Sequence, residues 1–319
     1  MATIKDVAKA AGVSISTTSY ALNDDPRIPE STASRIKNVA NDIGYFPSAA
    51  ARNLKKRSTK TILVAIADFG GPVYHELLEG IQSRLAKDNY TMIVSTGPSS
   101  ENLLKERSAD GAIITDIHIS DEILLKIAKN FSPIVVLDRS LSDGSIYNMT
   151  IDNQTAMQGL VEQILAKKYQ KIAFVHGVVD TYDNITRFQG CLSTINRAGI
   201  PLFSEYYGNF TKKSGERIAS DLLESKAELP EIFVCANDEM AVGIMDVLKT
   251  AGYRIPEDIA VTGFDDIELA RYYQPGLSTV KIRHAEWGRT IADAVIRLLK
   301  NETVEIKKQQ GEIIIRQSF

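Results

Sequence analysis

The chain is poor in cysteine, tryptophan and histidine, and it has no long hydrophobic run. Its 319 residues include two cysteines, one tryptophan and four histidines. Cys191 and Cys235 lie in apolar or helical contexts, which favours two buried thiols over a disulfide. The lack of a predicted disulfide in turn indicates a cytoplasmic location. The longest apolar stretches, such as TILVAIA at 61–67, are far too short to cross a bilayer. The N-terminus has neither an apolar core nor a small-residue cleavage site, so we expect no signal peptide.

The motifs that mark common enzyme classes are also missing. No GxGxxG follows a strand-like run, and neither a P-loop nor a GxSxG elbow is present. The histidines His75, His118, His176 and His284 are scattered, without the spacing of a metal site. We therefore predict no enzyme activity, no catalytic residue, no cofactor and no bound metal.

Charge is distributed unevenly along the chain. Residues 1–60 contain ten Lys and Arg against five Asp and Glu, whereas the whole chain has a net charge of −3. The first 60 residues therefore carry +5 and residues 61–319 carry −8. The basic residues concentrate at Arg52, Lys55, Lys56, Arg57 and Lys60. A basic head suits contact with phosphates, while an acidic body is repelled by nucleic acid; a solvated linker is the alternative interpretation of the basic run.

The first 22 residues have the layout of two short helices joined by a turn at Gly12. Thr3 is placed to cap the first helix, and Ser14 is placed to cap the second. The apolar positions recur at helical spacing: Ile4, Val7 and Ala8, then Ile15, Thr18 and Leu22. This spacing leaves one face of the second helix outward, with Ser16, Thr17 and Tyr20. Short polar side chains there suit base-edge contact in a major groove, so the pattern predicts a DNA-binding helix-turn-helix.

Residues 29–43 are expected to form a third helix that ends at Gly44. Tyr45 and Phe46 are expected to pack on the three-helix core. After Pro47, the segment 49–56 is helix-prone but has little apolar face beyond Leu54. Two helical turns are too short to be stable alone in water. The segment therefore suits folding on a DNA minor groove with Leu54 as a wedge, and a plain linker is the alternative.

From residue 61 onward, apolar strand-like runs alternate with amphipathic helices. The strand-like runs lie at 61–67, 91–95, 111–115, 133–137, 171–176, 231–235 and 258–263. The helices are expected near 74–88, 120–130, 153–168, 184–198, 212–226, 237–252 and 284–299. This alternation predicts α/β architecture with two doubly wound parallel-sheet lobes, divided near 148–152. Strand-like ends at 304–306 and 311–316 are expected to return to one of the lobes.

Taken in order, these segments resemble the lactose-repressor (LacI/GalR) family of bacterial transcription regulators. The likeness runs through TIKDVAKAAGVSISTTSYALN, GYFPSAAARNLKK, VYHELLEGI, DGAIIT, VVLDR, the IDN at 151–153, RFQG, CANDEMAVGIM and IPEDIAVTGFDD. The resemblance implies a helix-turn-helix domain at 1–47, a hinge helix and linker at 48–60, and a two-lobed, periplasmic-binding-protein-like domain at 61–319 for effector binding and dimerisation. It also implies a homodimer, sometimes a dimer of dimers, that binds a double-stranded DNA operator. A periplasmic solute-binding protein shares such a body but needs a signal peptide and has no use for residues 1–57.

The resemblance assigns DNA contacts to particular positions. The base-reading positions are Ser16, Thr17 and Tyr20, with Ile15 and Ser19 nearby; Leu54 is the minor-groove wedge; and Asn23, Arg27, Arg52 and Lys55 contact the backbone or groove. Asn23 has an alternative role as a cap at the end of the second helix, and Arg27 as a solvated turn residue. Many members carry arginine where this chain has Tyr20. Because tyrosine makes no bidentate contact with guanine, we expect a different operator half-site.

The resemblance also implies an effector between the lobes, typically a sugar or sugar phosphate and less often a purine or nucleoside. The matched positions are Asp152, Arg187, Asn237 and Asp265, with Tyr74 and Phe210 as aromatic candidates and Asp183 in a nearby loop. Such carboxylates, an amide and a guanidinium suit vicinal hydroxyls, and an aromatic face covers a sugar ring. The structural alternatives are that Asp238 caps a helix, that Asp265 and Asp266 cap a short turn, and that Arg187 pairs with a structural carboxylate. Because only Arg187 and Arg139 supply positive charge, a neutral sugar or oligosaccharide is favoured.

The expected function is repression of carbohydrate-utilisation genes, with release from a palindromic operator by a sugar. The alternative is a catabolite-control-type regulator whose DNA binding is strengthened by a small-molecule or phosphoprotein corepressor. The sequence does not show whether effector binding weakens or strengthens DNA binding, so the sign of the allosteric coupling stays open. The connection between residues 95 and 110 is also shorter than the usual crossover helix, so the dimer or protein-partner surface there is expected to differ.

Overall fold

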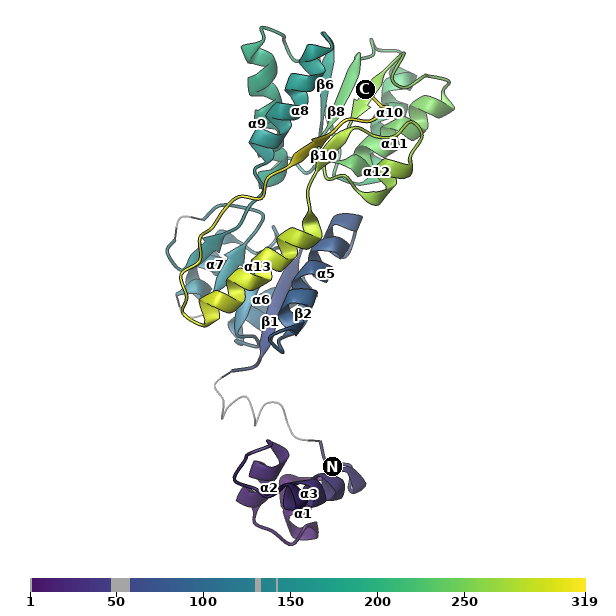
Figure 1. Cartoon of the computed structure of the whole chain (residues 1–319). Helices are drawn as coiled ribbons and strands as arrows, with labels where there is room; N and C mark the ends of the chain where they lie inside the picture. The colour runs from purple at the N-terminus through teal and green to yellow at the C-terminus, as the bar shows by residue number, and fades with distance from the viewer. Residues whose placement is uncertain (1, 47–57, 130–132, 142) are drawn as a thin grey trace. The chain divides into compact units, whose positions relative to one another are not determined.

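The computed structural model describes residues 2–46, 58–129, 133–141 and 143–319. The chain divides into two compact units, Met1–Thr59 and Lys60–Phe319 (Figure 1). The expected hinge helix falls on residues 47–57, which lie outside the described residues.

The first unit contains three helices, α1 (Ile4–Ala10), α2 (Ile15–Leu22) and α3 (Glu30–Asp42). Its core consists of Val7, Ala11, Ala21, Ile36 and Ala40. Two expectations for this core are wrong. Ile15 is 47% exposed, although Thr18 and Leu22 of the same predicted face pack inward, and Phe46 is 85% exposed while Tyr45 packs on the core. The core-facing side of α2 is therefore made by Thr18 and Ala21, which leaves Ile15 on the surface.

The second unit begins with a lobe built on a five-stranded parallel sheet of order β2-β1-β3-β4-β5. The strands are β1 (Thr61–Ile66), β2 (Thr91–Thr96), β3 (Gly111–Thr115), β4 (Ile134–Val136) and β5 (Ile146–Asn148). The helices of this first lobe are α5 (Pro72–Ala86), α6 (Pro98–Lys105), α7 (Asp121–Ala128) and α13 (His284–Leu299). The strand β1 is buried from Ile62 to Ile66, because helices cover both faces of the sheet.

The second lobe has a four-stranded parallel sheet of order β7-β6-β8-β9. The strands are β6 (Ile172–His176), β7 (Ser204–Tyr207), β8 (Ile232–Cys235) and β9 (Ala260–Thr262). The helices are α8 (Asn153–Ala166), α9 (Tyr182–Arg197), α10 (Lys212–Ser225), α11 (Asp238–Thr250) and the short α12 (Glu268–Tyr272). A small antiparallel pair, β10 (Thr279–Lys281) and β11 (Glu312–Ile314), completes it. Two doubly wound parallel-sheet lobes were predicted, and both are present.

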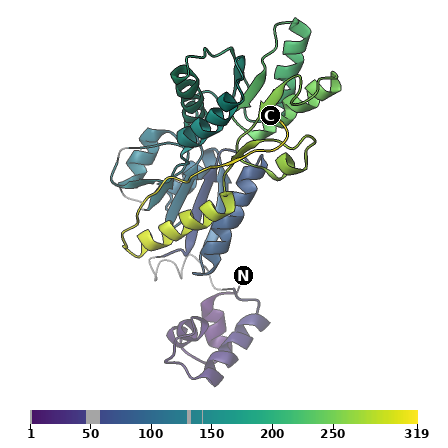
Figure 2. The ribbon, with the colours of Figure 1, turned by 45° about the horizontal axis from the view of Figure 1, so that its top comes forward.

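The helix α13 lies beside α5 in the first lobe, although about 200 residues separate them in sequence (Figures 1 and 2). Glycines make this close approach possible. A Cβ on Gly80 would lie 2.1 Å from the carbonyl oxygen of Ala285, and a Cβ on Gly288 would lie 2.4 Å from that of Leu77. Only glycine fits at these two positions without moving one helix away from the other.

The prediction placed one boundary between the lobes, near residues 148–152. This prediction is incomplete, because the chain passes between the lobes three times. It crosses after β5, again between β10 and α13, and a third time between α13 and β11 (Figure 1). The first and third crossings lie side by side: Ile151 pairs with Gln309, and the Asp152 amide donates to the Gln309 carbonyl oxygen at 2.8 Å. The expected strand at 304–306 is part of this third crossing and has no regular strand pairing.

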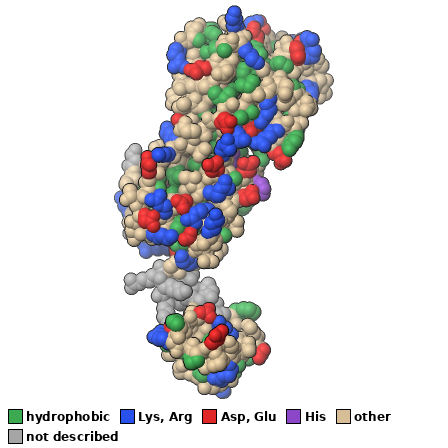
Figure 3. Space-filling view, viewed as in Figure 1, with side chains coloured by type: hydrophobic (Ala, Val, Ile, Leu, Met, Phe, Trp, Pro, Cys, Tyr) green, Lys and Arg blue, Asp and Glu red, His purple; other side chains and the backbone are tan. Residues whose placement is uncertain are grey.

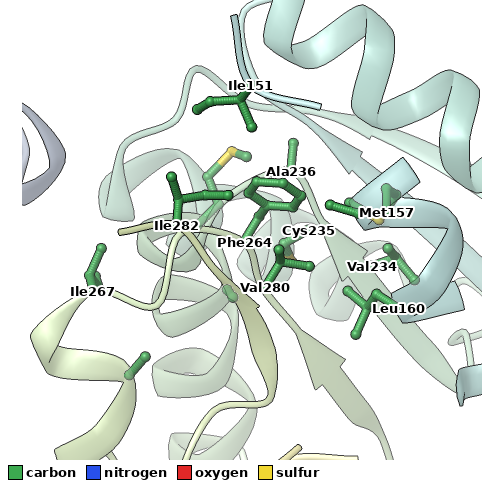
Figure 4. Close-up of a cluster of buried hydrophobic side chains, with 14 of the residues drawn as sticks. Ile151, Met157, Leu160, Val234, Cys235, Ala236, Phe264, Ile267, Val280 and Ile282 are labelled. Atoms are coloured by element: carbon green, nitrogen blue, oxygen red, sulfur yellow. The ribbon is translucent and has the colours of Figure 1, made fainter. Parts of the chain in front are cut away.

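The core of the second lobe is centred on the fully buried ring of Phe264 (Figure 4). Around it lie side chains from α8, β8, β10 and the crossings: Ile151, Met157, Leu160, Val234, Cys235, Ala236, Ile267, Val280 and Ile282. Cys191 and Cys235 are buried free thiols, as predicted.

Candidate functional site

The helix-turn-helix is fixed by local hydrogen bonds. The Ser14 hydroxyl accepts from the Thr17 amide at 3.0 Å and so caps α2, as predicted. Asn23 is the C-terminal cap residue of the same helix, and its side-chain amide donates to the Ser19 carbonyl at 2.7 Å. Its alternative role as a cap is therefore present in the structure. These caps hold α2 with Ser16 exposed and Thr17 and Ser19 half-buried.

Tyr20 and Arg27 form one unit at the end of α2. The Arg27 guanidinium lies 4.2 Å from the centre of the Tyr20 ring and donates two hydrogen bonds to Asp25, at 2.8 and 2.7 Å. These bonds raise the pKa of Arg27 above its usual range. Arg27 is thus exposed but paired with Asp25. Its guanidinium also contacts the ring of Tyr20, one of the expected base-reading residues.

The excess positive charge of the N-terminal region lies outside residues 2–46. Residues 2–46 contain five Lys and Arg and five Asp and Glu, so their net charge is zero. The whole excess comes from Arg52, Lys55, Lys56, Arg57 and Lys60. The predicted contacts Arg52, Leu54 and Lys55 lie outside the described residues.

In the second unit, Arg187 on α9 is the centre of a buried network. Its Nε donates to Asn153 Oδ1 at 2.9 Å, and one Nη donates to the Ala236 carbonyl oxygen at 2.7 Å. The other Nη lies 3.4 Å from Asp265 Oδ1. These partners lie at the start of α8 and just after β8 and β9, where polar residues gather at the carboxyl ends of parallel strands.

Asp183 joins this network through Asn153. The Asn153 side-chain amide donates to Asp183 Oδ1 at 2.7 Å. Asn153 was not predicted as a site residue, although it directly follows Asp152 in the IDN motif. Asp152 itself caps α8, with its carboxylate 3.5 Å from the Thr155 amide and 3.4 Å from Gln310 Nε2. Asp152 therefore contacts its own helix and a residue of the third crossing, whereas Asn153 contacts Arg187 and Asp183.

Asp265 connects the network to the second crossing. Its amide donates to the Val280 carbonyl at 2.7 Å, and its own carbonyl accepts from the Ile282 amide at 3.3 Å. His284, the first residue of α13, places Nε2 3.7 Å from Asp265 Oδ1. The structural alternative that Asp265 and Asp266 cap the short turn after the strand at 258–263 is wrong, because within the described residues their carboxylates accept from arginines and from no backbone amide. Asp266 instead pairs with Arg316 at 2.5 Å and Arg271 at 3.2 Å.

Asn237 and Phe210 lie together at another edge of the same lobe. Asn237 caps α11 by accepting from the Met240 amide at 3.1 Å, and its Nδ2 donates to the Phe210 carbonyl at 2.7 Å. The structural alternative that Asp238 caps this helix is wrong, because Asn237 is the cap residue. Asp238 is fully buried and accepts from the Ile267 amide at 2.9 Å and the Thr279 hydroxyl at 2.5 Å.

Tyr74 lies on α5 of the first lobe, and charges of both lobes act on it. Burial raises the pKa of Tyr74 to about 12, against a hydrogen bond with Thr115 that lowers it; Asp68, Asp183 and Asp138 also act on it electrostatically. Because Asp183 belongs to the second lobe, a charge of that lobe contributes to the raised pKa of Tyr74. Burial likewise raises the pKa of Asp138, although its neighbour Arg139 lowers it, and Asp183 adds to the rise.

Carboxylates of the two lobes act on one another where the lobes face each other. A Cβ on Gly71 of the first lobe would lie 3.0 Å from Glu239 Oε1 of the second. The pKa of Glu239 is raised by burial and by the charges of Asp265 and Asp68. Arg139 is committed to Asp138 and Asp121 and to two backbone carbonyls. Over the visible face of the whole unit, in contrast, acidic and basic side chains are interspersed (Figure 3).

A groove of about 390 Å³ lies elsewhere, on the first lobe between α6 and α7. Its lining residues are Leu104, Lys105, Arg107, Ser120, Glu122, Ile123, Lys126 and Ile127. None of the predicted effector residues contributes to it. The connection between β2 and β3 contains α6, which has eight residues.

The chain matches two family models. Residues 3–48 match bacterial regulatory proteins of the lacI family, and residues 161–319 match a periplasmic binding protein-like domain. Among the part of the chain that the structure describes, no helix is long and apolar enough to span a membrane.

Several proteins named as transcriptional repressors are similar over almost the whole chain. The HTH-type transcriptional repressor PurR of Vibrio atlanticus is 31% identical, over 99% of this chain and 98% of that protein. The probable HTH-type transcriptional repressor ExuR of Bacillus subtilis is 30% identical, over 100% and 98%.

Solved structures give the same result. A sugar-binding transcriptional regulator of the LacI family from Enterococcus faecalis is 33% identical, with a TM-score of 0.77 over 83% of this chain and 99% of that one. A lac repressor dimer bound to operator and an anti-inducer is 24% identical and shares the fold, with a TM-score of 0.86 over 99% and 98%. The helix-turn-helix, the two lobes and these relatives together show a DNA-binding transcriptional repressor rather than an enzyme, and the chain belongs to the LacI family of bacterial regulatory proteins.

Proposed function

We propose that this repressor is released from a palindromic operator when an uncharged sugar or oligosaccharide binds between its lobes. The observation that carries the proposal is the Arg187 network, which fixes one guanidinium among Asn153, Ala236 and Asp265. A binding site for a polyhydroxylated ligand needs rigid donors and acceptors in fixed directions. The network supplies both.

Hydrogen-bonding capacity remains for a ligand. Guanidinium has five N–H donors, and the recorded contacts of Arg187 use three of them. Within the described residues, Asp183 and Asp265 each keep one carboxylate oxygen without a hydrogen-bond partner. Vicinal hydroxyls both donate and accept, so a sugar satisfies this mixture. We assign effector contact to Tyr74, Asp152, Asp183, Arg187, Phe210, Asn237 and Asp265, with Asp152 contributing from the crossing.

The charge balance argues against an anionic effector. Asp68, Asp138, Asp183, Glu239 and Asp265 act on one another or on Tyr74 across the lobes. A phosphate or carboxylate placed among them would meet like charges, with Arg187 as its main cation. A neutral polyol avoids this repulsion. Two structural relatives are described as a sugar-binding regulator and as the regulator CelR in complex with cellobiose, and they support this ligand class by analogy.

We further propose that the repressor acts as a cytoplasmic homodimer on double-stranded DNA. The operator complex of the lac repressor dimer, which shares the fold, supports this by analogy. Each subunit would read one half-site through Ile15, Ser16, Thr17, Ser19 and Tyr20, with Asn23 and Arg27 beside them. The segment with Arg52, Leu54 and Lys55 would supply the positive charge and the minor-groove wedge.

The test is operator binding measured with and without sugar at fixed salt. An operator is first selected from random DNA, and its anisotropy is then titrated with glucose, galactose, cellobiose, lactose, maltose and sucrose. Glucose 6-phosphate, glucuronate, glucosamine and adenosine form the charged and non-sugar arms. Release by a neutral sugar alone supports the proposal. Release only by adenosine or a charged sugar contradicts the ligand class, and strengthened binding indicates a corepressor instead.

A further inference from the structure

Asn153 contacts two ionic side chains of the candidate effector site at once, Arg187 and Asp183. Its Oδ1 accepts from Arg187 Nε at 2.9 Å and its Nδ2 donates to Asp183 Oδ1 at 2.7 Å. Asn153 is 1% exposed, so its bond to Arg187 is buried, while its bond to the half-buried Asp183 is partly shielded from water. Its orientation is set by its partners, because arginine offers only donors and an ionised aspartate only acceptors.

Asn153 also stands at a crossing between the lobes. It is the first residue of α8 and follows Asp152, whose amide is bonded to the Gln309 carbonyl of the third crossing. On the other side of the guanidinium, Asp265 is bonded through its backbone to Val280 and Ile282 at the second crossing. Arg187 therefore joins a residue beside the first crossing to a residue beside the second.

We infer that Asn153 is a positioning residue, which holds Arg187 and Asp183 in register for the effector and ties both to the crossings. An asparagine is suited to this place because one amide group supplies the acceptor and the donor together. Alanine would leave a buried guanidinium N–H without its partner. Aspartate would keep the acceptor for Arg187 but would set two carboxylates against each other. The inference rests on the proposed function only for the identity of the ligand.

A direct test needs no sugar. The Nε–Hε resonance of Arg187, assigned by its loss in Arg187→Lys, is followed by NMR in the full-length protein. In the wild type we expect a sharp signal that exchanges slowly with water. In Asn153→Ala we expect exchange faster by roughly tenfold or more, the factor that follows from losing one buried hydrogen bond. The control Gln154→Ala, an exposed neighbour on α8, should keep the wild-type rate.

A swapped pair separates positioning from general packing. Asn153→Asp alone should disorder the Arg187 signal, because residues 153 and 183 would both be carboxylates. In Asn153→Asp combined with Asp183→Asn, the new amide donates to the new carboxylate, which still accepts from Arg187. The double variant should therefore recover a protected signal, a coupling that a double-mutant cycle measures. A signal that stays protected in Asn153→Ala, or a double variant no better than Asn153→Asp, would overturn the inference.

The sugar panel gives the functional arm. Asn153→Ala should lower the affinity for any releasing sugar by about tenfold or more, while the response of Gln154→Ala stays at the wild-type value. If no sugar in the panel releases the operator but the NMR result holds, then the ligand class fails and the positioning role stands. If a sugar releases the wild type and Asn153→Ala equally well, the positioning role fails and the ligand class stands.

Discussion

The guanidinium carbon of Arg187 lies 3.9 Å from the centre of the Phe264 ring, so the cation rests against the aromatic core of the second lobe. Phe264 is fully buried, and its ring is the centre of the apolar cluster in Figure 4. The ring holds the face of the guanidinium, while Asn153, Ala236 and Asp265 hold its edges. A cation–π contact with a desolvated arginine contributes on the order of 1–2 kcal/mol. The side chain is therefore positioned before any ligand arrives.

We predict that Arg187→Ala abolishes release by sugar and leaves operator binding without sugar intact. The variant removes the fixed donors, whereas the helix-turn-helix belongs to a separate compact unit. Operator anisotropy with and without the sugar measures both effects. The matched control is Arg197→Ala on the same helix, because Arg197 is exposed and pairs with Glu162 on the surface. Equal sugar responses in the two variants would contradict the role of Arg187.

Leu54→Ala should weaken operator binding by about tenfold or more, or roughly 1.4 kcal/mol, while sugar binding is unchanged. The reason is that a small side chain cannot act as an apolar wedge between base steps. The two quantities are measured by anisotropy and by calorimetry with the releasing sugar. Leu54→Met keeps an apolar side chain of similar size and is the control. Wild-type operator affinity in Leu54→Ala would rule out the wedge.

Asp238 should make the protein less stable as the pH rises above about 4. Burial raises the pKa of its carboxyl well above 3.8, with further increases from Asp265 and Asp266. The neutral form is favoured in the folded state, so its contribution is complete below the unfolded pKa and is lost as the pH rises through the folded pKa.

The test compares urea unfolding of wild type and Asp238→Asn between pH 4 and pH 8. Asparagine keeps an acceptor for the Ile267 amide and carries no charge. The stability of the variant relative to wild type should therefore grow from pH 4 to pH 8. A difference that is independent of pH would show that Asp238 is ionised without cost in the folded protein.

Both thiols should be unreactive in the native protein. Burial raises the pKa of Cys191 to about 12 and raises that of Cys235 as well. Since the thiolate is the reactive form, Ellman's reagent at pH 8 should detect no thiol before unfolding and two thiols in guanidinium chloride. Rapid reaction of one thiol in the native state would show that the second lobe opens readily.

Local features of the fold were predictable because their causes are local. Ser14 caps α2 through an amide three residues away, and Gly12 adopts the positive φ that the turn requires. The buried strands β1, β6 and β8 are continuous apolar runs, so composition alone indicates them. The strands β5, β7 and β10 were missed because each is very short and β7 is partly exposed, which leaves little apolar signal.

Misassigned residues show where local reasoning stops. In the pair Asn237-Asp238, either side chain suits a helix cap by type, and packing decided that Asn237 caps while Asp238 is buried against Thr279. Similarly, the IDN motif contains two candidates, and only the fold shows that Asn153 rather than Asp152 reaches Arg187.

The sequence by itself determined the family, the helix-turn-helix, the two-lobed α/β body and most of the residues expected to meet DNA and effector. These follow from residue periodicity, capping residues and short motifs, which depend on positions close together in the sequence. The tertiary structure alone decided the three crossings and the partners of Arg187. Asn153 and Asp265 lie 34 and 78 positions from Arg187 in sequence. No local spacing brings such residues together, because their meeting depends on how the sheets and crossings pack.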